Sequence, residues 1–373
     1  MKAQERHGFF PVAAGLGLTT ASVVLGGGFD LDQLVWLPLT LSVVVAISRP
    51  QLERRDAWLV AALACFAGVW LGRGALAGTA GRAASLSAFA IAFGCTYVLA
   101  RSCDESDRDA ATRWLTWLSA GVAVISLVGF LRHAEPWALA FDGAWRLAGP
   151  FAYPNAAGLF FALGLMAALR PDRRGWPERA GLGIGTATAL LATMSRAALL
   201  LAALALAGRA RRTTSLVVGG VVIGVVAFAL IANNASVDDR VAEWSAALRQ
   251  FRSEPIFGVG PERDLLIHNF RGDAIARYAH NEVLQIGAGA GAIGLASLAF
   301  VVVFALRVRR GQLVLAMLAV GALVDFNLHF LGVATMAGWL VGLDEPAPTD
   351  RPRRSRLQVG MSRSSRSADS EPT

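Results

Sequence analysis

The residues best suited to chemistry lie between Val237 and Gly294, the longest polar interval between apolar runs. This interval contains two of the five histidines, and one of them, His280, is followed by Asn281, Glu282 and the next apolar run. A histidine with a near-neutral pKa at such a position can accept a proton from an attacking sugar hydroxyl. We therefore predict that His280 is catalytic and that Asn281 and Glu282 support it. A capping or structural role for His280 is the alternative.

The other histidines are weaker candidates for a base. His268 is also followed by asparagine, but it lies in the middle of the polar interval and no apolar run follows it. His133 and His329 have weaker claims still. His329 forms a polar island with Asp325 and Asn327, and polar groups within a membrane protein usually face the interior of the bundle. We predict that Asp325 supports the site from there.

Three arginines close to apolar runs could bind an anionic group. Arg196 begins an apolar run, Arg240 follows two aspartates, and Arg146 precedes a turn and a helix start led by Pro154. Converging guanidiniums can grip a diphosphate through bidentate hydrogen bonds, which a lone lysine would do less well. The alternatives are an interfacial arginine that reaches toward water, a local ion pair with the aspartates, and simple loop-to-helix punctuation.

The composition predicts the elements that must hold these residues. Apolar residues make up 55% of the 373 residues, charged residues only 17%, and the mean hydropathy is +0.50. Many apolar runs have roughly the 17–25 residues that a helix needs to cross a bilayer core of about 30 Å. Uninterrupted runs of alanine, leucine and valine exclude the alternation of a membrane barrel. We predict an all-α, polytopic membrane protein.

The apolar runs define a membrane domain over residues 1–343, followed by a basic, disordered tail over 344–373. One large loop, 233–281, separates the late spans. The twelve predicted spans are about 8–27, 31–48, 57–72, 83–100, 114–131, 154–169, 179–194, 195–208, 213–232, 282–306, 312–326 and 328–343.

The distribution of basic residues predicts the orientation of these spans. Most of the 35 lysines and arginines fall at the two termini and in alternate connections, and this set is predicted to be cytoplasmic. The net charge of +8 is thus read as a topology signal, and no nucleic-acid partner is expected. Both termini are then cytoplasmic. The segments 132–153, 195–196, 233–281 and 325–329 are periplasmic, which gathers the candidate residues on one face.

The large loop itself has a helical pattern. Val241, Trp244, Leu248 and Phe251 recur at helical spacing, which predicts a helix along the membrane surface with lipids as its neighbours. Several prolines and glycines then break the pattern, and a second helix is predicted to start at Asn281 or Glu282. The sequence contains no P-loop and no HExxH motif, so we expect no metal, no cofactor and no nucleotide-sugar donor.

Five segments in order resemble the O-antigen ligase and polymerase-like family over roughly residues 146–340. They read GPFAYPNAAG, TMSRAALLLA, DDRVAEWSAALRQFRSEPIFGVG, AHNEVLQIGAGAGAIG and VDFNLHF. The resemblance implies a glycosyltransferase of the bacterial inner membrane that works at the periplasmic side. Such enzymes move a glycan from an undecaprenyl-diphosphate carrier to an acceptor, either lipid A core or a growing glycan, without a metal.

The resemblance also implies roles for individual residues. Arg196 and Arg240 match family arginines and would hold the carrier diphosphate, with Arg146 as a supporting contact. His280 matches the histidine of a His-Asn motif and would prepare the acceptor hydroxyl. One departure concerns an acidic residue that family members often carry where this chain has 288–290, Ala-Gly-Ala. Glu282 is a candidate substitute for that acid.

Two other functions remain open at this point. The same site could polymerise repeat units of an O-antigen or exopolysaccharide, and the sequence does not separate that activity from ligation to lipid A core. The chain could also be a transporter or flippase. That class predicts polar residues spread through the membrane midplane and paired broken helices, whereas here the polar groups gather at one face.

Overall fold

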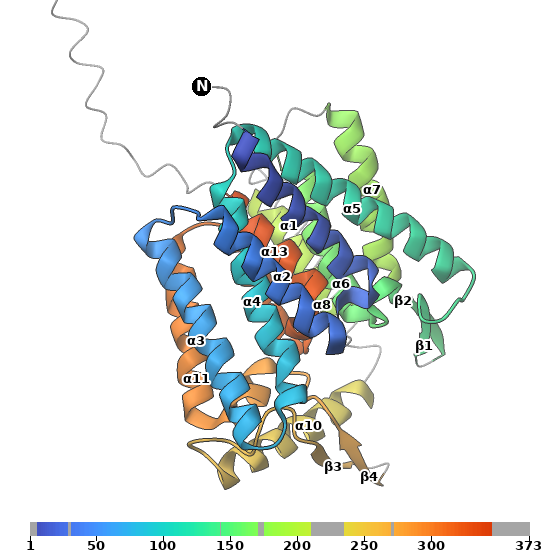
Figure 1. The fold of residues 1–373 in the computed structure, drawn as a ribbon. Coiled ribbons are helices and arrows are strands. Elements are labelled where there is room, and N and C mark those ends of the chain that lie inside the picture. Colours follow the sequence, from blue (N-terminus) through green and yellow to red (C-terminus); the bar gives the residue numbers. More distant parts are fainter. Residues whose placement is uncertain are drawn as a thin grey trace, which may run out of the picture.

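The structure, a computed structural model, describes residues 6–28, 31–141, 143–170, 175–209, 235–269 and 272–344. Within these ranges the chain is mostly helical (Figure 1). The α-helices are α1 (Arg6–Val24), α2 (Leu31–Ser48), α3 (Arg54–Leu76), α4 (Ala80–Ser102), α5 (Glu105–Leu131), α6 (Pro154–Ala168), α7 (Trp176–Ala192), α8 (Arg196–Arg209), α10 (Ala235–Ser253), α11 (Glu282–Val308), α12 (Gln312–Val324) and α13 (Leu331–Leu343).

Each predicted span within the described residues overlaps one helix, and most bounds agree closely. The exception is α5, which begins at Glu105 where the span was predicted from residue 114. The predicted span 213–232 and the tail beyond residue 344 lie outside the described residues. Among the described residues, four helices are long and apolar enough to cross a membrane by themselves, namely α3, α4, α5 and α11. Other apolar helices are shorter. The chain is therefore a helical membrane protein with several candidate spans, and the predicted number of twelve stays a prediction.

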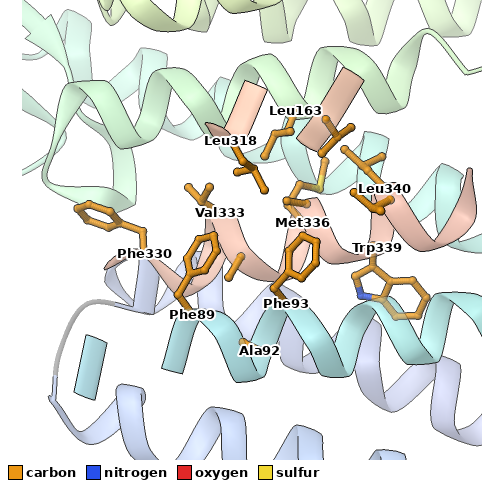
Figure 2. Packing of buried hydrophobic residues seen from close by; sticks show 14 of the residues in the cluster. Phe89, Ala92, Phe93, Leu163, Leu318, Phe330, Val333, Met336, Trp339 and Leu340 are labelled. Carbon is orange, nitrogen blue, oxygen red and sulfur yellow. The ribbon is translucent and has the colours of Figure 1, made fainter. Parts of the chain in front are cut away.

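The centre of the bundle is built where α13 packs along α4. Phe89 and Phe93 of α4 interleave with Val333, Met336 and Trp339 of α13, as Figure 2 shows. The two backbones approach closely because α13 has Gly338 and Gly342 at the contact, where a Cβ atom would collide with the backbone of α4. Small residues at helix crossings allow this packing in membrane bundles, where lipid supplies no hydrophobic drive.

The two ends of the bundle are chemically different. At one end, ion pairs tie together the predicted cytoplasmic connections, joining Arg101 to Asp56, Arg310 to Glu53 and Arg170 to Asp344. The other end holds the starts of α4, α6, α8, α11 and α13, together with α10 and the connections predicted to be periplasmic. In Figure 1, α10 lies at this far end, across the bundle from the N-terminus. All candidate site residues belong to it.

The connections at this end contain two antiparallel hairpins, which the all-α prediction missed. One joins β1 (Ala138–Phe141) to β2 (Ala144–Leu147), and the other joins β3 (Leu265–Asn269) to β4 (Gly272–Ala276). Their turns use Gly143 and Gly272, both at positive φ, and an Asp-Gly pair at the first turn is a strong hairpin signal. In β3, Leu265 and Ile267 are buried against α10, so the hairpin fixes how this helix sits.

The large loop also inserts its backbone into a break in α11. Gly291 has φ 60° and ψ −152°, so the helical ladder of α11 is interrupted there. Val259 and Gly260 donate hydrogen bonds to the carbonyls of residues 288 and 289, and the amide of residue 292 donates to the carbonyl of Pro255. Arg73 of α3 donates to two carbonyls of the inserted segment, those of 257 and 258. The polar groups freed by the break are thus satisfied inside the protein, as a membrane helix requires.

Candidate functional site

Arg146 is held between two other segments of the site. It lies on β2, and its Nε donates to the carbonyl of Thr193 at 3.0 Å, just before the start of α8. Its Nη2 donates to Oδ1 of Asn155 at 2.9 Å, in the first turn of α6. The β1–β2 hairpin, the start of α8 and the start of α6 therefore meet at this one guanidinium.

Arg196 and Arg240 lie close enough to Arg146 to act on it electrostatically. Burial lowers the pKa of Arg146, and the positive charges of Arg196 and Arg240 lower it further, while Tyr153 and Asp325 oppose the change. Arg240 donates to the carbonyl of residue 324 at 2.6 Å. Arg196 makes no hydrogen bond or ion pair with any other described residue, so its donors can take an anion. The structure thus brings the three predicted arginines together from three separate segments.

Asp325 is the buried acid beside these arginines. It accepts a hydrogen bond from the hydroxyl of Tyr153 at 2.7 Å and another from the amide of Asn155. Because Asn155 also binds Arg146, the acid and this arginine share one amide side chain. The prediction that Asp325 faces the interior is confirmed by its burial. Three converging guanidiniums make this region suited to an anionic group.

His280 lies at the same end and is hydrogen-bonded to an acid that the sequence analysis did not select. Its Nδ1 is 2.7 Å from Oε2 of Glu243, a buried residue of α10. The imidazole also packs edge-on against Phe326, with ring centroids 5.1 Å apart. These two contacts fix the orientation of the imidazole ring. Within the described part of the chain, Nε2 of His280 has no hydrogen-bond partner, so this nitrogen is available to a substrate.

The surroundings of His280 raise its pKa above the usual value. Burial by itself lowers the pKa, but the hydrogen bond to Glu243 and the negative charges of Asp325 and Glu243 outweigh it, while Arg240 acts in the opposite direction. The influence of Asp325 and Arg240 places His280 beside the arginine cluster. An imidazole with an acid on Nδ1 and a free Nε2 has the arrangement of a general base whose tautomer is set by its partner.

Asn281 and Glu282 have structural contacts that explain their place beside His280. Asn281 caps α11 through a hydrogen bond from the amide of residue 284, and its own amide donates to the carbonyl of residue 323. The predicted helix start at this position is confirmed. Glu282 is buried and turns away from His280 toward His329, with Oε2 3.2 Å from Nε2 of that ring. Glu282 is therefore not the acid that contacts His280.

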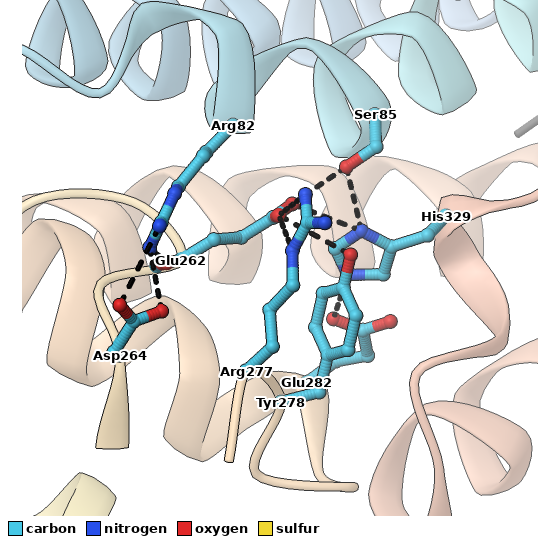
Figure 3. A network of polar contacts seen from close by, with 8 residues as sticks. All are labelled: Arg82, Ser85, Glu262, Asp264, Arg277, Tyr278, Glu282 and His329. Atoms are coloured by element: carbon cyan, nitrogen blue, oxygen red, sulfur yellow. Dashed lines mark hydrogen bonds and ion pairs between the residues drawn. The ribbon is translucent and has the colours of Figure 1, made fainter. Parts of the chain in front are cut away.

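His329 belongs to a buried polar cluster behind His280, drawn in Figure 3. Its Nδ1 lies 2.6 Å from the hydroxyl of Ser85 and 3.1 Å from Glu262, and its Nε2 faces Glu282. Arg277 and the hydroxyl of Tyr278 also bind Glu262. The cluster therefore joins α4, the large loop, the start of α11 and the turn before α13.

The departure at residues 288–290 has a structural explanation in this chain. Gly289 packs against Trp70 and Pro261, and a Cβ on Gly258 would collide with the backbone of Gly289. The inserted loop thus fills the space that a longer side chain would need here. An acid is still present beside His280, but Glu243 of α10 supplies it.

Several residues of the site escaped the sequence analysis. Glu243 had one available signal, because it lies three residues after Arg240 on a predicted helix, and residues at this spacing share a face. Tyr153 and Asn155 lie in the quoted segment GPFAYPNAAG but were not selected individually. Phe326 has rings on both sides, since Tyr278 and Tyr153 stack on it with centroids at 4.3 and 4.6 Å. Nothing in the local sequence indicated that three-ring stack.

The sequence model of the O-antigen ligase family matches residues 181–299 of the chain. The match runs from α7 into α11 and includes Arg196, Arg240 and His280. No curated protein matches the chain. The resemblance to the O-antigen ligase family is confirmed over these residues, and it supports glycosyl transfer of the ligase or polymerase kind by a multi-pass membrane protein.

Proposed function

We propose that this chain transfers a glycan from an undecaprenyl-diphosphate carrier to a sugar hydroxyl of an acceptor, with lipid A core as the acceptor. The reaction takes place on the periplasmic side of a bacterial inner membrane. One observation supports this proposal above the others. Arg146 lies within electrostatic reach of Arg196, Arg240 and Asp325, and the same acid acts on His280, whose Nε2 has no hydrogen-bond partner among the described residues.

In this proposal the arginines receive the carrier diphosphate. Arg196 has no hydrogen-bond or ion-pair partner in the part of the chain that the structure describes, and there Arg240 uses one of its own donors on the carbonyl of residue 324. Arg146 is directed by Thr193 and Asn155, so its remaining nitrogen is held in a defined place. Guanidiniums that are already ordered stabilise the negative charge that grows on the departing diphosphate without further reorganisation.

His280 prepares the acceptor. Its Nε2 takes the proton of the acceptor hydroxyl while the hydroxyl oxygen attacks the anomeric carbon of the donor sugar. The bond between that carbon and the diphosphate oxygen breaks, and the carrier diphosphate leaves with the electron pair and remains bound by the arginines. Glu243 accepts the Nδ1–H hydrogen bond and stabilises the imidazolium that forms. Attack opposite the leaving group inverts the anomeric configuration.

The test is a transfer assay with the purified chain in detergent. Undecaprenyl-diphosphate glycan is offered with lipid A core or with a second lipid-linked repeat unit, and His280→Ala is compared with the wild type. His133→Ala is the matched control, because His133 is an exposed histidine that stacks on Trp145. We expect product on lipid A core that is lost in His280→Ala and kept in His133→Ala.

The other outcomes would replace this proposal. A ladder of longer lipid-linked glycans would identify a polymerase that uses the same site. Absence of product with both acceptors, together with movement of labelled carrier across a reconstituted bilayer, would identify a transporter. Equal activity of His280→Ala and the wild type would remove the proposed base.

A further inference from the structure

The buried cluster around His329 is not used by the transfer step described above, yet it contacts the segments that carry His280 and Asp325. Glu262 belongs to the inserted loop, Glu282 lies two residues after His280, and His329 lies four residues after Asp325. The side chains of all three are buried. A group of charges that is withdrawn from water costs free energy unless the charges are balanced and hydrogen-bonded, so such a cluster needs an explanation.

The geometry favours a positive charge at the centre of this cluster. Both ring nitrogens of His329 face carboxylates, with Nδ1 3.1 Å from Glu262 and Nε2 3.2 Å from Glu282. A neutral imidazole can donate from only one nitrogen, whereas an imidazolium donates from both. The pKa of His329 agrees with this reading. Burial lowers it, but the two carboxylates outweigh burial and raise it to about 10.

The remaining members of the cluster complete its balance of charge. Arg277 binds Oε2 of Glu262 at 3.1 Å, and the hydroxyl of Tyr278 binds the same oxygen at 3.3 Å. The hydroxyl of Ser85 donates to Oε1 of Glu262 at 2.6 Å. Two carboxylates thus meet one imidazolium and one guanidinium, and their formal charges cancel.

We propose that His329 is a positioning residue of the transfer site, which holds His280 and Asp325 in their working places by joining Glu282 to Glu262. This inference rests on the proposed function for its activity readout. Each end of the link leads to the site. Glu282 fixes the start of α11 directly after His280, and it also accepts the amide of residue 328 in the turn that follows Asp325.

The link also reaches the rigid core of the bundle. Ser85 lies in the first turns of α4, the helix that packs most extensively against α13. Arg82, one turn earlier on α4, donates to the backbone carbonyl of Glu262 and to the carboxylate of Asp264, so it holds the loop at these two residues. The loop that carries Glu262 is therefore set against α4, and His329 transmits that placement to the two segments that carry His280 and Asp325.

The experiment measures both the placement and the reaction. Spin labels at Leu266 of β3 and Leu323 of α12, both exposed, report the position of the loop relative to the bundle in a chain whose three cysteines are replaced by alanine. We expect one narrow distance distribution in the wild type and a wider or shifted one in His329→Gln. His133→Gln is the matched control and keeps the narrow distribution.

The kinetic readout separates placement from donor binding. In His329→Gln, kcat falls about a hundredfold, since a displacement of about 1 Å at a reacting group can cost that much. The KM for an undecaprenyl-diphosphate oligosaccharide changes by less than about threefold, because Arg146 and Arg196 are held by segments outside the cluster. A merely destabilised fold would instead lower the amount of active protein and leave kcat per active molecule unchanged.

A second variant tests the role of charge. His329→Gln combined with Glu282→Gln again balances the cluster, since Glu262 and Arg277 then remain as the charged pair. We expect this double variant to narrow the distance distribution toward the wild type. An unchanged distribution and unchanged kcat in His329→Gln would overturn the proposal, as would a double variant no better than the single one. A wild type that transfers to neither acceptor would refute the proposed function alone, because the label distances still report the positioning.

Discussion

Nδ1 of His280 lies 2.7 Å from Oε2 of Glu243, although 37 residues separate them in the chain. Glu243 also lies one helical turn after Arg240, so α10 presents an acid to the base and a guanidinium to the anion region. This short helix therefore couples the two halves of the proposed reaction. It also makes the pH dependence of the reaction a test of the pairing.

Glu243→Gln should change the pH profile of the reaction. The wild-type rate rises with pH as His280 loses its proton, at a pKa above the usual 6.5, because the hydrogen bond and charge of Glu243 favour the protonated ring. Removing that charge moves the rising limb to lower pH. The maximal kcat falls at least about tenfold, within the roughly 10²–10⁴-fold contribution of a general base. The measurement is kcat/KM against pH from 5 to 9.

The matched control for this variant is Glu254→Gln, which changes an exposed glutamate close to the end of α10. Glu254→Gln should change neither the pH at which the rate rises nor the maximal rate. If the rate of Glu243→Gln rises at the same pH as that of the wild type, Glu243 does not act on His280 during turnover.

Arg196→Ala and Arg240→Ala should each slow transfer strongly. Removal of one donor that stabilises developing negative charge costs about 2.7–4 kcal/mol, which is about 10²–10³ in kcat. Arg249→Ala and Arg263→Ala are the controls, because among the described residues these exposed arginines bind backbone carbonyls of the loop, those of residues 266 and 259. The assay compares kcat at equal amounts of folded protein. Full activity in either of the first two variants would exclude that arginine from the diphosphate site.

The helices of this chain were predictable because each apolar run carries its own signal. Most span boundaries fell within a few residues of the observed helices, although α5 begins at Glu105 and its span was predicted from residue 114. The cap at Asn281 was recognisable from its position before an apolar run. The prediction missed the hairpins because it considered only the helical spacing of apolar residues in the loop. In β3, Leu265 and Ile267 are buried and Leu266 between them is exposed, so burial repeats every two residues as in a strand.

The site was partly predictable for the same reason. Arg196 stands at the edge of a predicted span, and Arg146 and Arg240 lie in the connections next to one, where the cost of charge near lipid makes each arginine noticeable. Glu262 and Glu243 lie among ordinary polar loop residues, and their partners are 67 and 37 residues away. The partner of Glu262 is His329, and the partner of Glu243 is His280. Only the folded loop brings these pairs together. The helical spacing of Glu243 from Arg240 could not indicate His280 as its partner, and no local pattern marked Glu262.

Gly291→Ala should destabilise the fold through the break in α11. Gly291 has φ 60° and ψ −152°, a conformation that residues with a side chain rarely adopt, and a Cβ there would collide with the backbone of Ile256. We expect a loss of about 2–4 kcal/mol. Gly287→Ala is the control, since its Cβ would meet Phe251 at an ordinary 3.5 Å. Thermal unfolding in detergent measures both, and equal midpoints would contradict the role of the inserted loop.

The stability of the wild type should fall as the pH rises from about neutral toward 10, and His329 should account for part of that fall. The pKa of His329 is raised from 6.5 to about 10 in the folded chain. The folded state therefore binds a proton that the unfolded state has released, and this contribution is complete below 6.5 and lost as the pH passes through 10. One proton changes the free energy of unfolding by at most about 1.36 kcal/mol per pH unit.

The measurement is the difference in unfolding midpoint between the wild type and His329→Gln in detergent from pH 6 to pH 10. Groups far from His329 have the same surroundings in both proteins, so their effects cancel in the difference. We expect the unfolding midpoint of the wild type to exceed that of His329→Gln by most near pH 6, and the two midpoints to converge toward pH 10. A constant difference would mean that His329 does not carry the proton, and the charge balance with Glu262, Glu282 and Arg277 would then have to be abandoned.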